Sequence, residues 1–189
     1  MGEIELAAKA YGEAGKLFEK EDLSQSAANQ AFLKSADLSC TFSKPEWENI
    51  IPVYEKVIKN YLWKDILKSS AKPLIIKLCF CFLAFDDLIG AKKKFNFYLG
   101  EDPTLMSSWE GELVDGLLQA KEENDREKFD KTLWGYTRIT PFGKVENAIL
   151  SHVVDLFDGI GSGKEVLGEE LKLDDDCLLY TSDAADEED

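Results

Sequence analysis

Three tyrosines recur at nearly equal spacing along the chain, and this repeat limits the fold more than any other feature. Tyr11, Tyr54 and Tyr98 are separated by 43 and 44 residues, and each lies in a segment with apolar residues every three or four positions. That period is typical of amphipathic helices, and a repeat of this length falls within the range of helix-pair solenoids. One helical hairpin cannot bury its apolar face alone. We therefore expect stacked hairpins with a continuous core and a concave surface for a partner.

The same periodicity predicts an all-α protein, because no segment shows the alternating pattern of a strand. The expected helices cover residues 3–20, 27–36, 47–58, 65–82, 89–98, 107–120, 127–135 and 142–157, with a weak ninth at 164–173. The fold class that we expect is a tetratricopeptide-like helical-hairpin solenoid ending in a small C-terminal helical bundle.

Local signals place several helix ends and one buried helix. Asp22 and Ser24 are candidate N-caps for the second helix. Thr140 and Pro141 are expected to supply the cap and the first turn of the eighth. Pro73 should interrupt the helix at 65–82. Because that helix is apolar on nearly all faces, we expect it to be the most buried.

Composition divides the chain into three parts. Residues 1–158 carry the helical repeats, residues 159–176 are expected to form an acidic flexible segment, and residues 177–189 do not continue the fold. The last part, CLLYTSDAADEED, is similar to a translated sequencing adaptor, with a native acidic tail as the alternative. The first helix carries Ile4, Leu6 and Ala7 on its early turns and has no capping repeat before it. We therefore expect the chain to be the C-terminal part of a longer array.

The distribution of charge argues against nucleic-acid binding. The formal net charge is −15, and residues 174–189 hold eight acids and no base, so the rest of the chain is mildly acidic. Phosphate binding needs a basic face, which this balance does not favour. The apolar run at 74–85 contains Lys77 and is too short to cross a bilayer. Without a signal peptide pattern, the expected location is the cytoplasm.

No residue pattern predicts catalysis, a metal site or a cofactor. The four cysteines lack C-x-x-C spacing, and Cys79 and Cys81 would point about 200° apart on a helix. We expect reduced, mostly buried thiols. The segment GIGSGKE at 159–165 departs from a phosphate loop, because Glu165 stands where Ser or Thr would hold magnesium. His152 has no partner at a catalytic spacing and is expected to be an ordinary surface or core residue.

Several segments, taken in order, resemble one family. These are YGEAGKLF, SAANQAFLKSAD, ENIIPVYEKV, ILKSSAKPLIIKLCFCFLAFDDLIGAK and LLQAKEEND. Together they resemble the alpha-SNAP (soluble NSF attachment protein) family from about Ile4 to Phe157, which is roughly the C-terminal half of that family's chain. The combination of LKSSAK with the DLIGAK turn is the specific part. The resemblance implies a non-enzymatic adaptor that wraps a SNARE four-helix bundle and recruits the hexameric ATPase NSF.

The resemblance also implies partner-facing residues. Lys34, Lys68 and Lys72 stand where the family carries basic residues that face SNARE complexes of the syntaxin type. The alternative is that they are ordinary solvated helix lysines. Gln30 stands where the family usually has another lysine. The basic run at 92–94 is denser than in the family, and a solvated face is the favoured interpretation.

For NSF the resemblance implies acids near the end of the helical region and a leucine near the terminus. Glu122 and Glu123 match the first feature, and Leu171 or Leu173 the second. The family's membrane-touching apolar loop belongs to the N-terminal half, so membrane contact here is expected only through partners. A general tetratricopeptide-like scaffold for another peptide or helical partner is the alternative function.

Overall fold

The computed structural model describes residues 2–20, 24–157 and 159, and within them it contains eight α-helices, two short 3-10 helices and no strand. The α-helices are α1 (Glu3–Lys20), α2 (Gln25–Ser39), α3 (Trp47–Leu62), α4 (Lys68–Ala84), α5 (Leu88–Glu101), α6 (Trp109–Glu122), α7 (Arg126–Thr137) and α8 (Lys144–Phe157). The 3-10 helices η1 (Asp65–Leu67) and η2 (Pro103–Leu105) lie between α3 and α4 and between α5 and α6. The all-α class is confirmed.

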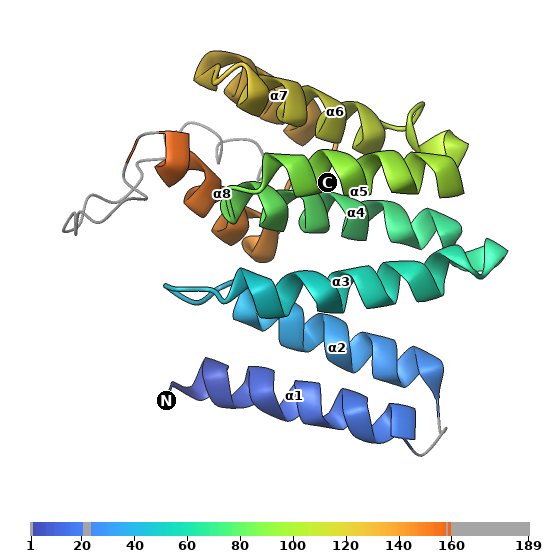
Figure 1. Ribbon diagram of the computed structural model, residues 1–189. Helices are drawn as coiled ribbons and strands as arrows, with labels where there is room; N and C mark the ends of the chain where they lie inside the picture. The colour runs from blue at the N-terminus through green and yellow to red at the C-terminus, as the bar shows by residue number, and fades with distance from the viewer. Residues whose placement is uncertain (1, 21–23, 158, 160–189) are drawn as a thin grey trace, which may run out of the picture.

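Successive helices run antiparallel and stack from α1 to α7 as a layered array of hairpins (Figure 1). The most extensive contacts join α1 to α2, α3 to α4 and α6 to α7. The last helix, α8, leaves this order and packs against α4 at one side of the array. This arrangement confirms the expected helical-hairpin solenoid.

The helix α4 is the centre of the hydrophobic core. It contacts α3, α5, α6 and α8, so apolar side chains on every side of it are covered. From residue 74 to residue 84 every residue except Lys77 is buried. A helix surrounded by other helices needs apolar residues all round, and this explains the continuous apolar run in the sequence. The expectation that this helix is the most buried is confirmed.

Pro73 does not interrupt α4, contrary to the sequence-based expectation. The helix continues through it from Lys68 to Ala84. Pro73 lacks the amide hydrogen that would bond to the Ser69 carbonyl, but both residues are exposed, so water can satisfy that carbonyl. The irregularity lies earlier, at η1, where the chain makes a 3-10 turn before α4 begins.

The three repeated tyrosines occupy similar helices but differ in burial. Tyr54 and Tyr98 are buried, whereas Tyr11 is exposed. The difference follows from packing: α3 contacts both α2 and α4, and α5 contacts both α4 and α6, whereas α1 packs mainly on α2. The repeat therefore marks equivalent positions in the hairpins, whereas the burial of each tyrosine depends on whether other helices pack on both sides of its own helix.

The start of α8 differs from the expectation that Thr140 caps it and Pro141 opens it. The helix begins at Lys144. Before it, the Phe142 ring stacks on Tyr136 at a centroid distance of 5.4 Å and meets the edge of Phe80 at 5.5 Å. We attribute the later start to this aromatic anchor, because it fixes Phe142 against α4 and α7 in a non-helical segment at the surface, before the first turn of α8.

Short polar side chains cap the starts of four helices, directly after the connecting turns. Ser24, Asp87, Ser108 and Asp125 each accept a hydrogen bond from a backbone amide in the first turn of α2, α5, α6 and α7, respectively. Ser24 confirms one expected cap, whereas Asp22 lies outside the described residues. Side-chain caps of this kind satisfy amides that have no partner within the helix.

Several expectations concern parts of the chain outside the described residues. These are the weak helix at 164–173, the adaptor-like tail at 177–189, Leu171, Leu173 and, apart from Gly159, the acidic segment at 159–176.

Candidate functional site

Lys68 and Lys72 lie one helical turn apart at the start of α4. Each contacts a neighbouring 3-10 helix, η1 for Lys68 and η2 for Lys72. The Lys68 Nζ atom lies 2.8 Å from the Asp65 carboxylate in η1. The hydrogen bond with Asp65, together with its charge, raises the pKa of Lys68, and the same contact lowers the pKa of Asp65. Lys72 donates from Nζ to the Thr104 carbonyl in η2, at 3.4 Å. The start of α4 is thereby a basic corner beside the α5–α6 connection.

Lys34 lies on α2 and lines a different feature, an open groove of about 630 Å³ between α1 and α2. The groove is mainly apolar, and its lining residues are Tyr11, Ala14, Phe18, Ala27, Gln30, Ala31, Leu33, Lys34 and Asp37. No carboxylate in the described part of the chain lies within ion-pair distance of the Lys34 ammonium. Gln30, where the family pattern would have lysine, lines the same groove and leaves Lys34 as the one base among its lining residues.

A polar cluster that sequence analysis missed joins α2, α4 and α8. Lys77 Nζ lies 3.0 Å from Asp37 Oδ1 and 3.4 Å from Glu146 Oε1, and the lysine side chain is only 14% exposed. Burial alone would lower the pKa of Lys77, but the charges and hydrogen bonds of the two carboxylates outweigh it and raise that pKa. The sequence indicates this cluster only through Lys77, a single charge inside an apolar run. Its partners, Asp37 and Glu146, are distant in the chain.

Tyr54 connects α3 to the same cluster. Its hydroxyl donates to Asp37 Oδ1 at 2.5 Å and lies 3.7 Å from Cys40 Sγ. Burial is the main reason that the pKa of Tyr54 is raised far above its ordinary value, with Cys40 and Asp37 adding to it. The tyrosine therefore stays neutral and acts as a hydrogen-bond donor at neutral pH. The repeated tyrosine at position 54 thus fills space in the core and also links α3 to Asp37 of α2 by a hydrogen bond.

Sulfur and imidazole groups in the described residues show no arrangement for chemistry. Cys40, Cys79 and Cys81 are buried free thiols, as the sequence predicted. Burial raises the pKa of Cys79 to about 12 and also raises that of Cys81, which disfavours the reactive thiolate. His152 packs its ring edge-on against Trp47 at 5.6 Å. Within the described ranges no group of three or more His, Cys, Asp or Glu residues could hold a metal ion.

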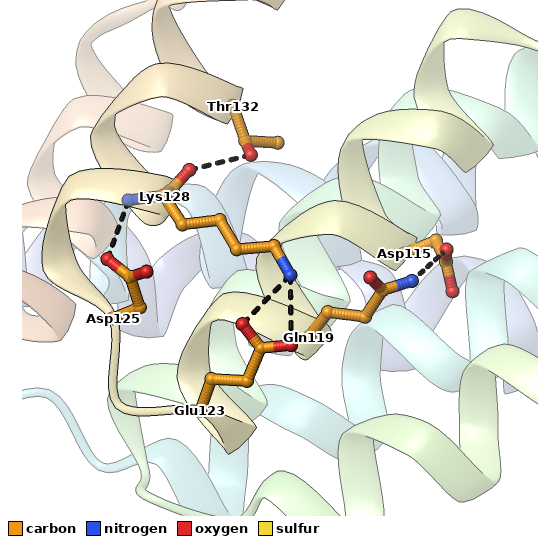
Figure 2. A network of polar contacts seen from close by, with 6 residues as sticks. All are labelled: Asp115, Gln119, Glu123, Asp125, Lys128 and Thr132. Carbon is orange, nitrogen blue, oxygen red and sulfur yellow. Dashed lines mark hydrogen bonds and ion pairs between the residues drawn. The ribbon is translucent and has the colours of Figure 1, made fainter.

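Glu122 and Glu123 lie at the end of α6, beside the α6–α7 turn. Glu122 pairs with Lys92 of α5 at 2.5 Å. Glu123 accepts two contacts of 3.0 Å from the Lys128 ammonium on α7, and Figure 2 shows this pair between the two helices. Nearby, Asp125 accepts from the Lys128 backbone amide. Each acid is therefore paired with a lysine of a neighbouring helix, while more than half of each acidic side chain stays exposed.

The basic run at 92–94 is not a uniformly solvated face. Lys92 pairs with Glu122, and Lys94 lies 2.8 Å from Glu55 on α3. Lys93 is exposed. Two of the three lysines thus form ion pairs between helices. The helices that the structure describes include none long and apolar enough to cross a membrane.

Comparison with known proteins agrees with this architecture. A family model described as "Soluble NSF attachment protein, SNAP" matches residues 1–155. The chain is 28% identical over 152 residues to the alpha-soluble NSF attachment protein of Dictyostelium discoideum, covering 80% of this chain and 51% of that protein. It is 28% identical over 138 residues to the human alpha-soluble NSF attachment protein, covering 73% and 45%, respectively.

A probable vesicular-fusion protein of Neurospora crassa is 29% identical over 152 residues, covering 80% of this chain and 51% of that protein. The chain thus spans about half the length of the curated relatives that it matches. Because the family model covers most of the sequence, and the helical-hairpin array agrees with it, the chain belongs to the soluble NSF attachment protein family.

Proposed function

We propose that this chain is a non-enzymatic adaptor that binds SNARE complexes and recruits NSF for their disassembly during vesicle fusion and intracellular protein transport. The observation that carries the proposal is the family match over residues 1–155 on a continuous array of helical hairpins. An array of this kind offers a long surface to an extended helical partner. The expected location is the cytosolic face of membranes, reached through these partners.

On the SNARE side, the proposed contacts are Lys34, Lys68 and Lys72. Lys34 adds an unpaired charge to an apolar groove, a combination that suits an amphipathic helix with acidic residues. Lys68 and Lys72 already have weak exposed partners, Asp65 and the Thr104 carbonyl. An acidic partner can replace such contacts at little cost, because exposed ion pairs contribute little to stability. A syntaxin-type complex is the specific partner that we propose.

On the NSF side, the proposed contacts are Glu122 and Glu123, with Leu171 or Leu173 as the apolar element. The two acids have lysine partners within the fold but keep exposed carboxylates beside the α6–α7 turn. The two leucines lie outside the described residues and are carried by the family resemblance alone.

The test of the SNARE side is capture of purified SNARE complex by immobilised chain at several salt concentrations. Lys68→Glu with Lys72→Glu should weaken capture by at least about tenfold, because charge reversal replaces attraction with repulsion. The matched control is Lys16→Glu with Lys20→Glu, also four residues apart on an exposed helical face, but turned away from the groove. Wild-type capture should also weaken between about 0.1 and 0.5 M salt. Equal capture by the two variants would refute the lysine assignment.

A further inference from the structure

The turn between α3 and α4 exposes two large apolar side chains at the most prominent end of the array. It projects beyond the neighbouring helix ends (Figure 1). Trp63 is 74% exposed and Ile66 is 92% exposed, the highest value among the large apolar side chains that the structure describes. Large exposed apolar groups three residues apart in one protruding turn indicate an interaction site.

The backbone of this turn is ordered by its own hydrogen bonds, so the exposure of the two side chains is built into the fold. The amides of Trp63, Lys64 and Leu67 donate to the carbonyls of Lys59, Tyr61 and Lys64, respectively, at 2.8–3.2 Å. Immediately before the tip, Leu62 is buried in the core and anchors the end of α3. The fold therefore holds Trp63 and Ile66 in water although neighbouring apolar residues are covered.

The charge around the tip is opposite to that of the chain as a whole. Between residues 59 and 72 there are four lysines and one acid, whereas the whole chain has a net charge of −15. Lys59 and Lys64 are exposed, and the Lys59 ammonium lies over the Trp63 ring at 5.1 Å. Lys68 and Lys72 lie on the first two turns of α4. A local basic patch on an acidic protein selects for an anionic surface.

We propose that the α3–α4 turn is a membrane-contact site, in which Trp63 and Ile66 enter the interface of an anionic bilayer. The indole ring suits the headgroup region, where its apolar body is covered and its N–H group can still find a partner. Lys59 and Lys64 face the negative surface potential of anionic lipids. A convex tip needs a matching pocket on a rigid protein, whereas a fluid lipid surface can close around it.

Trp63 and Ile66 are not among the proposed SNARE and NSF contacts, although the proposed SNARE contacts Lys68 and Lys72 follow them directly at the start of α4. The turn adds a direct lipid contact to the indirect one proposed above. It does not require insertion of a helix across the bilayer. Two side chains and two or more lysines would give a weak, reversible attachment that depends on anionic lipid content. Such an attachment would orient the array with its α3–α4 edge toward the membrane.

The test is co-sedimentation of the full chain with vesicles of phosphatidylcholine alone or with added phosphatidylserine, without any SNARE protein or NSF. The chain should bind the anionic vesicles, bind neutral vesicles much more weakly, and dissociate as salt rises. Trp63→Ser with Ile66→Ser should weaken binding by about tenfold or more, because both inserted groups are removed. Lys59→Glu with Lys64→Glu should weaken it by a similar factor on anionic vesicles only.

The matched control is Trp134→Ser with Ile139→Ser, which removes an exposed tryptophan and an exposed isoleucine near the end of α7. This variant should bind vesicles as the wild type does. Failure of the wild type to bind anionic vesicles, or equal binding by the two apolar variants, would overturn the proposal. If the Trp63 and Ile66 variant keeps vesicle binding but loses capture of SNARE complex in lipid-free buffer, the turn is a protein contact instead.

Discussion

Replacing Lys77 by methionine should destabilise the fold more than removal of any exposed lysine. Methionine keeps most of the side-chain volume but removes the charge that lies between Asp37 and Glu146. Two carboxylates would then face each other in a largely covered site. Breaking a fully buried pair costs about 3–5 kcal/mol. The carboxylates here keep 23% and 20% exposure, and Tyr54 still donates to Asp37. We therefore expect about 2–3 kcal/mol.

The matched control is Lys131→Met on α7. Lys131 lies 3.3 Å from Glu127, close to the 3.4 Å between Lys77 and Glu146, but both side chains are more than three-quarters exposed. Exposed pairs of this kind contribute less than about 0.5 kcal/mol. Thermal unfolding followed by circular dichroism should therefore show a Tm about 4–12 °C lower for Lys77→Met and nearly unchanged for Lys131→Met.

The pH dependence gives a second readout. The folded-state pKa of Lys77 is raised above its ordinary value of 10.5. A raised lysine pKa contributes stability that is fully present below the unfolded-state pKa and is lost as pH rises through the folded-state value. The difference in unfolding free energy between wild type and Lys77→Met should thus be constant from about pH 6 to 9 and shrink above about pH 10.5. Equal unfolding of Lys77→Met and Lys131→Met would refute the reasoning.

Two further substitutions test how helices begin in this array. Gly111→Ala should destabilise the protein by about 1–3 kcal/mol in urea unfolding, since a Cβ atom there would lie 1.9 Å from the Leu105 carbonyl oxygen. Gly100→Ala, with open space around it on α5, should be neutral or stabilising, and the same loss in both would contradict the steric explanation. Asp87→Ala should cost about 1 kcal/mol by removing the cap on the Gly90 amide, whereas Asp87→Asn should keep most of that stability.

The sequence was sufficient for the helices and the central position of α4, because both depend on local periodicity and on one long apolar run. The exposure of Tyr11 and the later start of α8 were not predictable in this way. They depend on which helices lie on each side of α1 and on the packing of Phe142 against Tyr136 and Phe80.

The polar contacts were harder to predict than the helices. Lys77 was visible as a charge in an apolar run, but nothing local identifies Asp37 or Glu146 as its partners. In the same way, the contact between Lys72 and the Thr104 carbonyl depends on the position of η2 beside α4. The family resemblance pointed to Lys68, Lys72, Glu122 and Glu123 as partner residues, and these remain predictions.

The most direct test of the adaptor account is the rate at which NSF, supplied with ATP, disassembles purified SNARE complex when this chain is added. We predict that the chain captures the complex and accelerates its disassembly. Glu122→Lys with Glu123→Lys should keep capture but lose the acceleration, because the proposed NSF contact reverses sign. Capture of the complex or of another helical partner with no effect of the wild-type chain on NSF would contradict the account and favour a general helical-repeat scaffold.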